Sequence, residues 1–105
     1  MSGRVLVVDG ANVVGSRPDG WWRDRAGAAR RLADDLSGLG ASAAPHVRVV
    51  LVLEGAARRG VPAGRHSALE AALEVVHAPG SGDDEVVRQV GLAAGGSPGR
   101  VEVVT

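Results

Sequence analysis

The stretch VLVVDGANVV, residues 5–14, decides the fold class of this chain. Its first four residues are aliphatic without any polar alternation, which is typical of a β-strand covered on both faces, as in a parallel sheet. Asp9 and Asn12 then interrupt the apolar run. A carboxylate and a carboxamide at the end of a buried strand require a reason. A simple strand-ending Asp-Gly turn is the structural alternative to a functional site.

The rest of the chain alternates between strand and helix patterns. Four apolar runs predict strands, at residues 4–8, 47–53, 73–78 and 100–104. Trp22–Leu39 has apolar residues at three- and four-residue steps, which predicts an amphipathic helix that ends at Gly38 and Gly40. Ser81 and Asp84 have the spacing of a capping box, which predicts a second helix from residue 81 onward.

This alternation predicts an α/β fold of three layers, α/β/α, with a parallel sheet of four strands. Residues 56–72 mix Gly, Pro and Arg, and are expected to form a loop with at most a short helix. One domain over residues 1–105 is expected, because domain lengths cluster near ~100–150 residues.

Acidic residues follow three of the predicted strands. Asp9 follows the first, Glu54 the second, and Asp83 and Asp84 open the helix after the third. Because parallel strands place their carboxyl ends at one edge, we expect these acids to converge there. Hard oxygen ligands without any thiolate suit Mg²⁺ or Mn²⁺, which would activate water against a phosphodiester. Asn12 is expected to orient water, a phosphate or a ligating carboxylate.

Composition excludes several other chemistries. All twelve basic residues are Arg, so no Lys is present for a P-loop, a receiver domain or an aspartyl-nucleophile phosphatase. GANVVG does not match the dinucleotide fingerprint G-x-G-x-x-G. The absence of Cys excludes disulfides, thiolate zinc sites and cysteine nucleophiles. Since the formal net charge is zero, contact with a nucleic acid requires a local basic patch.

Basic and aromatic residues interleave at one place, residues 17–23. Trp22 is expected to anchor the first long helix on the sheet, whereas Arg17, Trp21 and Arg23 are candidates for stacking on bases and contacting phosphates of RNA. Other polar residues are expected at the surface or in packing roles, and these are His46, His66, His77, Asp34 and Asp35.

Three segments of the chain together resemble the NYN family of PIN-like ribonucleases, closest to its actinobacterial YacP-like branch. They are VLVVDGANVVGSRPDGWWRDRAGAARRL (residues 5–32), VVHAPGSGDDEVV (75–87) and VEVVT (101–105). The resemblance implies a metal-dependent endoribonuclease that uses Mg²⁺ or Mn²⁺, with RNA as substrate and a possible association with the ribosome. By position, Asp9 matches the acid after the first strand, Asn12 the polar residue of that motif and Asp84 the acid opening the later helix, with Asp83 as a competing assignment.

The end of the sequence departs from the family pattern. In relatives, the strand that corresponds to residues 101–105 is followed by another acid, a helix and a final strand. The chain is therefore expected to lack its last acidic ligand, and a non-catalytic RNA-binding or interaction module is the alternative function. An uncovered strand at residues 100–104 predicts pairing with a second copy. A cytoplasmic protein is expected, because no signal-peptide pattern and no apolar run of ~20 residues is present.

Overall fold

The computed structural model describes residues 4–18, 20–43, 47–66, 73–96 and 100–105. They form one five-stranded sheet with the strand order β3-β4-β2-β1-β5. The strands are β1 (Arg4–Asp9), β2 (Val47–Leu53), β3 (Gly64–His66), β4 (Leu73–His77) and β5 (Arg100–Val104). Strand β1 pairs in parallel with β2 and β5, and β2 pairs in parallel with β4.

The four expected strands are present and parallel, but the expectation of a wholly parallel sheet is wrong because a fifth strand lies at one edge. Strand β3 pairs antiparallel to β4, with Gly64 opposite Val75 and His66 opposite Leu73, so the sheet is mixed. Three residues are too few to show an alternating pattern, and β3 lies in a stretch that was expected to be a loop. The remainder of that stretch, residues 67–72, lies outside the described residues.

Within the described residues, five helical elements connect the strands. They are α1 (Gly10–Gly15), η1 (Trp21–Arg23), α2 (Arg25–Ala43), η2 (Gly55–Gly60) and α3 (Gly82–Gly96). The long helix expected at residues 22–39 begins at Arg25, because the Asp24 side chain accepts a hydrogen bond from the Gly27 N–H at 2.8 Å, an N-cap contact. It also continues past Gly38, whose missing side chain leaves open space beside the helix. The helix expected from residue 81 is confirmed as α3.

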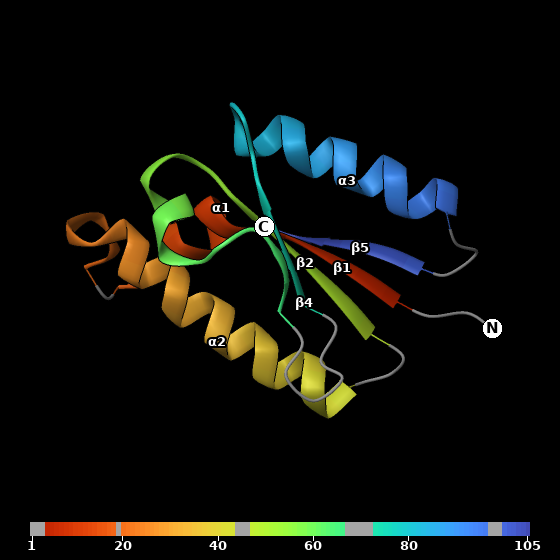
Figure 1. The fold of residues 1–105 in the computed structure, drawn as a ribbon, viewed down its shortest axis with the longest axis horizontal. Coiled ribbons are helices and arrows are strands. Elements are labelled where there is room, and N and C mark those ends of the chain that lie inside the picture. The colour runs from red at the N-terminus through yellow and green to blue at the C-terminus, as the bar shows by residue number, and fades with distance from the viewer. Residues whose placement is uncertain (1–3, 19, 44–46, 67–72, 97–99) are drawn as a thin grey trace.

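Helices cover both faces of the sheet, as Figure 1 shows. Alternate residues of each central strand face opposite sides. Val8 and Leu51 pack with Leu32 of α2, whereas Val7 and Val50 pack on the α3 side. The buried residues are almost all Val, Leu and Ala, so the two cores consist of many small contacts rather than a few aromatic ones. Among the described helices, none is long and apolar enough to cross a membrane.

Candidate functional site

Asp9 is the last residue of β1 and the N-cap of α1. Its side chain is buried, with an exposed fraction of 4%. Its Oδ1 accepts a hydrogen bond from the Asn12 backbone N–H at 3.4 Å, and its Oδ2 accepts one from Asn12 Nδ2 at 3.2 Å. Of the partners that were expected for Asn12, the structure therefore shows a carboxylate, which the Asn12 amide holds in place.

Gly10 begins a helix and does not form the strand-ending turn that was the alternative for this motif. A Cβ at Gly10 would lie 2.6 Å from the Val52 carbonyl oxygen and 2.9 Å from Leu53 Cδ2. Glycine is thus required because α1 starts directly against β2. The sequence did not reveal α1, since two glycines and two β-branched valines in six residues have poor helix propensity.

The parallel register brings three predicted acids to the same edge. Burial is the main cause that raises the pKa of Asp9 above its usual value. The Asn12 N–H opposes this shift, whereas a hydrogen bond with the Asp83 carboxyl and the charges of Asp83 and Glu54 raise the pKa of Asp9 further. Asp83 therefore lies within hydrogen-bonding reach of Asp9, and Glu54 is near enough for its charge to act on Asp9.

Glu54 connects the end of β2 to the start of α3. Its Oε2 accepts a hydrogen bond from the Gly82 N–H at 2.7 Å, which satisfies one of the four N–H groups that a helix leaves free at its N-terminus. A Cβ at Gly82 would lie 3.1 Å from Glu54 Cδ, so glycine permits this approach. The sequence predicts Glu54 at this edge, whereas its contact with α3 depends on the tertiary structure.

The first turn of α3 contains the two adjacent acids. The Asp84 N–H donates to Ser81 Oγ at 3.3 Å, which is the expected cap contact. Asp83, and not Asp84, is the member of the pair that acts on Asp9. The assignment of Asp84 as the principal ligand, which came from the resemblance, stays a prediction.

The carboxylates fit a hard cation in their chemistry, although they do not form a closed cage. Within the part of the chain that the structure describes, no group of three or more His, Asp or Glu side chains is arranged to hold a metal ion. Mg²⁺ commonly binds one or two carboxylates and completes its octahedron with water and substrate phosphate. Asp9 and Asp83 match that donor set.

A pocket of about 480 Å³ opens next to this edge of the sheet, and Gly10, which follows Asp9, lines it whereas Asp9 itself does not. Elements distant in sequence form its walls: α1 with Gly10 and Val14, the start of α2 with Arg25, and Glu54 at the end of β2. Trp21 contributes the aromatic surface. The volume falls within the range of ~300–1,000 Å³ that is typical of ligand sites.

The expectation that Trp22 packs on the sheet and that Trp21 is the exposed residue is wrong. Trp22 is 57% exposed, whereas Trp21 is half-buried and packs against the core on the α2 side. Both tryptophans lie in η1, before α2 begins at Arg25, and this short helix places Trp21 against the core and leaves Trp22 exposed. The rings meet edge to face with their centroids 6.0 Å apart. A Trp21→Ala variant would therefore lose packing as well as any stacking on RNA.

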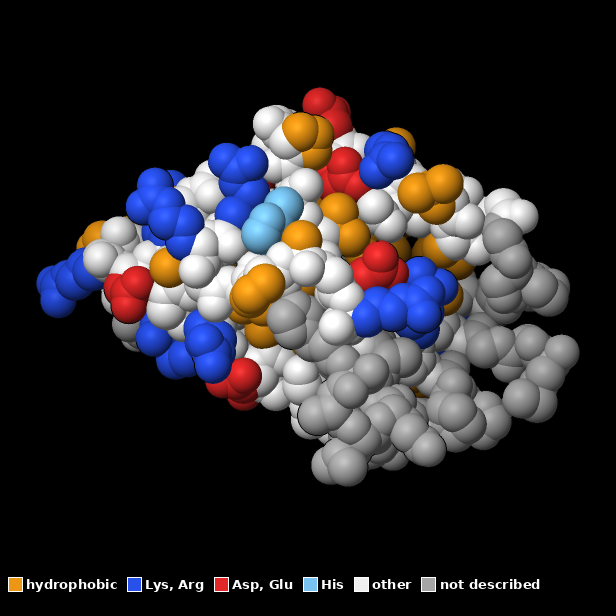
Figure 2. Space-filling model, viewed as in Figure 1, with side chains coloured by type: hydrophobic (Ala, Val, Ile, Leu, Met, Phe, Trp, Pro, Cys, Tyr) orange, Lys and Arg blue, Asp and Glu red, His pale blue; other side chains and the backbone are white. Residues whose placement is uncertain are grey.

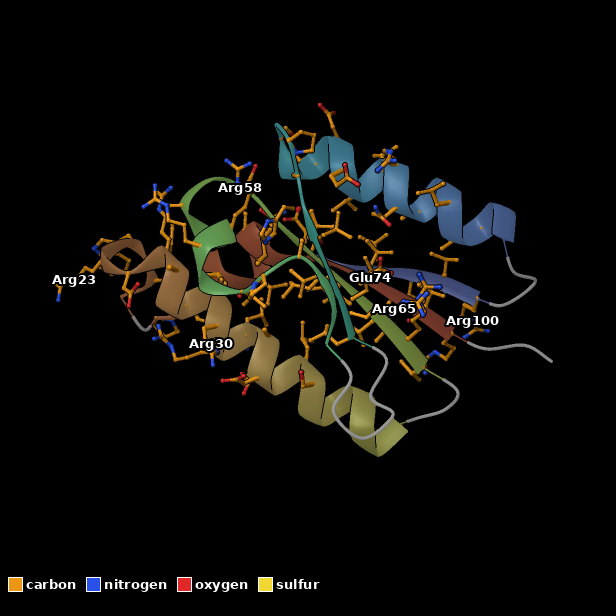
Figure 3. All side chains as sticks on the ribbon, in the orientation of Figure 1. Arg23, Arg30, Arg58, Arg65, Glu74 and Arg100 are labelled. Carbon is orange, nitrogen blue, oxygen red and sulfur yellow. The ribbon has the colours of Figure 1, made fainter. Side chains whose placement is uncertain are left out.

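Arginines gather around this end of the molecule, as the blue surface on the left of Figure 2 shows. Arg23 and Arg58 lie at this end in Figure 3, whereas Arg65 and Arg100 lie at the opposite one. Arg58 donates to the carbonyl oxygens of Gly55 at 3.1 Å and Ala78 at 3.4 Å. The net charge of zero thus conceals the local basic patch that nucleic-acid binding requires.

Other candidates have structural contacts. Arg17 forms an ion pair with Asp35 at 3.1 Å, and Arg23 lies 5.8 Å from the centroid of the exposed Trp22 ring. His77 Nε2 is 2.7 Å from the Val61 carbonyl oxygen, so this side chain has a structural contact. Asp34 and Asp35 are exposed, as expected. His46 and the side chain of His66 lie outside the described residues.

One buried acid was not identified from the sequence. Glu85 of α3 is 5% exposed and accepts hydrogen bonds from Arg88 at 3.0 Å and Gln89 at 2.7 Å. Both donors lie one helical turn further along α3, so the i,i+3 and i,i+4 spacing was the available signal. These contacts give Glu85 a structural role within its helix.

Comparison with known proteins identifies no relative. No family model matches the sequence, and no curated protein or solved structure matches it significantly. The function is therefore argued from the geometry of these residues.

Proposed function

We propose that this chain is a metal-dependent endoribonuclease of the NYN and PIN-like type, with a three-layer α/β/α fold, acting in the cytoplasm. One observation carries the proposal: the buried Asp9 at the end of β1, Glu54 at the end of β2 and Asp83 in the first turn of α3 come together at the carboxyl edge of the parallel strands. Carboxylates that lie close together repel one another, and a bound cation removes that penalty.

Asp9 and Asp83 are the residues that would hold Mg²⁺ or Mn²⁺, with Glu54 near them. Such an ion supplies an activated water and neutralises the charge that develops on the phosphate. Asn12 fixes the Asp9 carboxylate through its amide. Glu54 holds the start of α3, and thereby Asp83, against the sheet. The arginines around this end would contact the RNA phosphates.

The end of β5 is adjacent to the same site. Val104 pairs with Val8, so Thr105 follows β5 where Asp9 ends β1. A chain that continued past Thr105 would emerge beside Asp9. An acid in such a segment would complete the ligand set that the family resemblance implies.

A non-catalytic RNA-binding module is the second candidate. It is favoured by the lack of a three-acid group among the described residues. The two candidates share the arginines and the pocket, and they differ only in cleavage.

The proposal is tested by Mn²⁺-dependent cleavage of a generic single-stranded RNA. Asp9→Asn is compared with Asp34→Asn, which removes an exposed carboxylate on α2. We expect cleavage by the wild type and by Asp34→Asn, and a loss of roughly 100-fold or more in Asp9→Asn, because metal catalysis contributes several kcal/mol. If neither the folded wild type nor a chain extended past Thr105 with an acid cleaves RNA, the enzymatic function is rejected. The RNA-binding module is then the function that remains.

A further inference from the structure

The pocket next to the carboxyl edge of the sheet combines flat surfaces with aliphatic ones. The Arg25 guanidinium carbon lies over the Trp21 ring, 5.6 Å from its centroid, and both of these planar side chains line the pocket. Val14, Leu53 and Ala57 supply aliphatic surface. A planar, largely apolar ligand fits such walls, and unpaired nucleobases stack on aromatic rings and on guanidinium planes.

The polar groups of the pocket are few and of opposite kinds. When ionised, Glu54 can only accept hydrogen bonds, and Arg25 can only donate them. Glu54 Oε2 already accepts from the Gly82 N–H, which fixes the direction of the carboxylate. Each carboxylate oxygen has two lone pairs, so Glu54 retains capacity for a ligand.

These groups discriminate among the four RNA bases. Guanine presents adjacent N1–H and N2–H donors to a carboxylate, and its O6 and N7 accept from arginine. Uracil has carbonyl oxygens on both sides of its single N–H, so it would place an acceptor against Glu54. Adenine and cytosine have one exocyclic amino group each, beside a ring nitrogen that accepts.

Arginines continue outward from the same pocket. Ala57, which lines it, belongs to η2, and η2 also carries Arg58 and Arg59. These two arginines line a second hollow of about 540 Å³ together with His77. A strand with one base inserted beside Glu54 would pass its phosphates along this basic surface (Figure 2).

We propose that the pocket formed by Trp21, Arg25 and Glu54 binds an unpaired guanine of single-stranded RNA, next to the proposed metal site at Asp9 and Asp83. The proposal rests on the proposed function for its substrate class. It adds a base preference at one position.

Binding is measured without cleavage, through Trp21 fluorescence in a Trp22→Phe background with EDTA present. The probes are the RNA pentamers UUGUU, UUAUU, UUCUU and UUUUU. We expect UUGUU to quench Trp21 and to bind about tenfold or more tightly than UUUUU, because a matched pair of base contacts is worth ~1–3 kcal/mol. Glu54→Gln keeps an acceptor for the Gly82 N–H and should reduce this preference to about threefold or less.

A pocket-filling variant tests the location. Ala11 is an exposed residue of α1 that lines the pocket, so Ala11→Leu should fill it and weaken UUGUU binding by about tenfold or more. Ala94→Leu, on the exposed side of α3, is the matched control and should bind as the parent does. Equal affinity for the four pentamers, absence of quenching, or unchanged binding in folded Ala11→Leu would overturn the proposal.

The proposed ribonuclease activity and the proposed guanine pocket can be rejected independently of each other. The binding titration needs neither metal nor cleavage, so its outcome does not depend on whether the chain is an enzyme. Metal-dependent cleavage without guanine preference would reject the pocket assignment alone. Guanine binding without cleavage by any form of the chain would reject the enzyme alone.

Discussion

The side chain of Asp9 has several contacts that act on stability in opposite directions. Its carboxyl caps α1, contacts Asn12 and lies within hydrogen-bonding reach of Asp83, all while nearly fully buried. Capping stabilises the fold, whereas burial of the charge and the repulsion by Asp83 destabilise it. Substitution of Asp9 should therefore change both the free energy of unfolding and the binding of a metal ion.

Replacement of Asp9 by Asn should change how stability depends on pH. The pKa of Asp9 is higher in the folded chain than the unfolded value of 3.8, so the folded state binds the proton more tightly. This favourable contribution is complete below pH 3.8 and is lost as the pH rises through the folded pKa. Because Asn keeps the cap without the charge, Asp9→Asn should have a larger free energy of unfolding than the wild type at pH 7.

The difference between Asp9→Asn and the wild type should shrink on acidification to pH 3, and urea unfolding at both pH values measures it. Mn²⁺ should reverse the order at pH 7 by stabilising only the wild type, by about 2.7 kcal/mol at 100 times its Kd. Asp34→Asn is the control and should show neither effect. A wild type that Mn²⁺ leaves unchanged would contradict Asp9 as a ligand.

Gly10 is required by a close approach to the backbone of β2. Gly10→Ala would force a Cβ to 2.6 Å from the Val52 carbonyl oxygen, so we expect a loss of about 1–3 kcal/mol in the free energy of unfolding. Gly38→Ala, inside α2 with open space around it, should instead gain ~0.5–1 kcal/mol. Urea denaturation compares the two, and equal effects would argue against the close contact.

At the scale of elements, the contact between Glu54 and α3 determines where that helix begins. Glu54→Ala would leave the Gly82 N–H without its partner in a buried position, and we expect a loss of about 1–3 kcal/mol. Glu74→Ala breaks an exposed ion pair with Arg48 and should cost no more than about 1 kcal/mol. Thermal or urea unfolding tests both, and a smaller loss for Glu54→Ala than for Glu74→Ala would contradict this account.

At the scale of the whole molecule, β5 forms one edge of the sheet, as the uncovered strand was expected to do. Val103 and Val104 remain 45% and 40% exposed, although α3 packs beside the strand. Its outer edge has no neighbouring strand among the described residues. An edge of this kind offers backbone groups for pairing with a second copy.

We therefore predict a homodimer through β5. Sedimentation velocity should show association that increases with concentration, and Val103→Lys should shift the chain to a monomer because a charge opposes edge pairing. Val87→Lys, on the exposed side of α3, is the control and should leave the dimer intact. A wild-type monomer at high concentration with β5 ordered would contradict the prediction.

The central strands and the position of the acids follow from local sequence pattern. Unbroken aliphatic runs predict buried parallel strands, and parallel strands must end at one edge, so Asp9, Glu54 and Asp83 were expected together from local pattern and topology alone. The capping pair at Ser81 likewise depends only on residues close in sequence.

Only the tertiary structure decided the features that depend on contacts between distant segments. The antiparallel strand β3 forms because β4 is available beside it, and α1 forms against β2 despite poor propensity. Burial of Trp21 rather than Trp22, and the effect of Asp83 rather than Asp84 on Asp9, depend on where α2 and α3 begin relative to the sheet. The two members of each adjacent pair have nearly the same sequence surroundings. Only their packing in the folded chain distinguishes their roles.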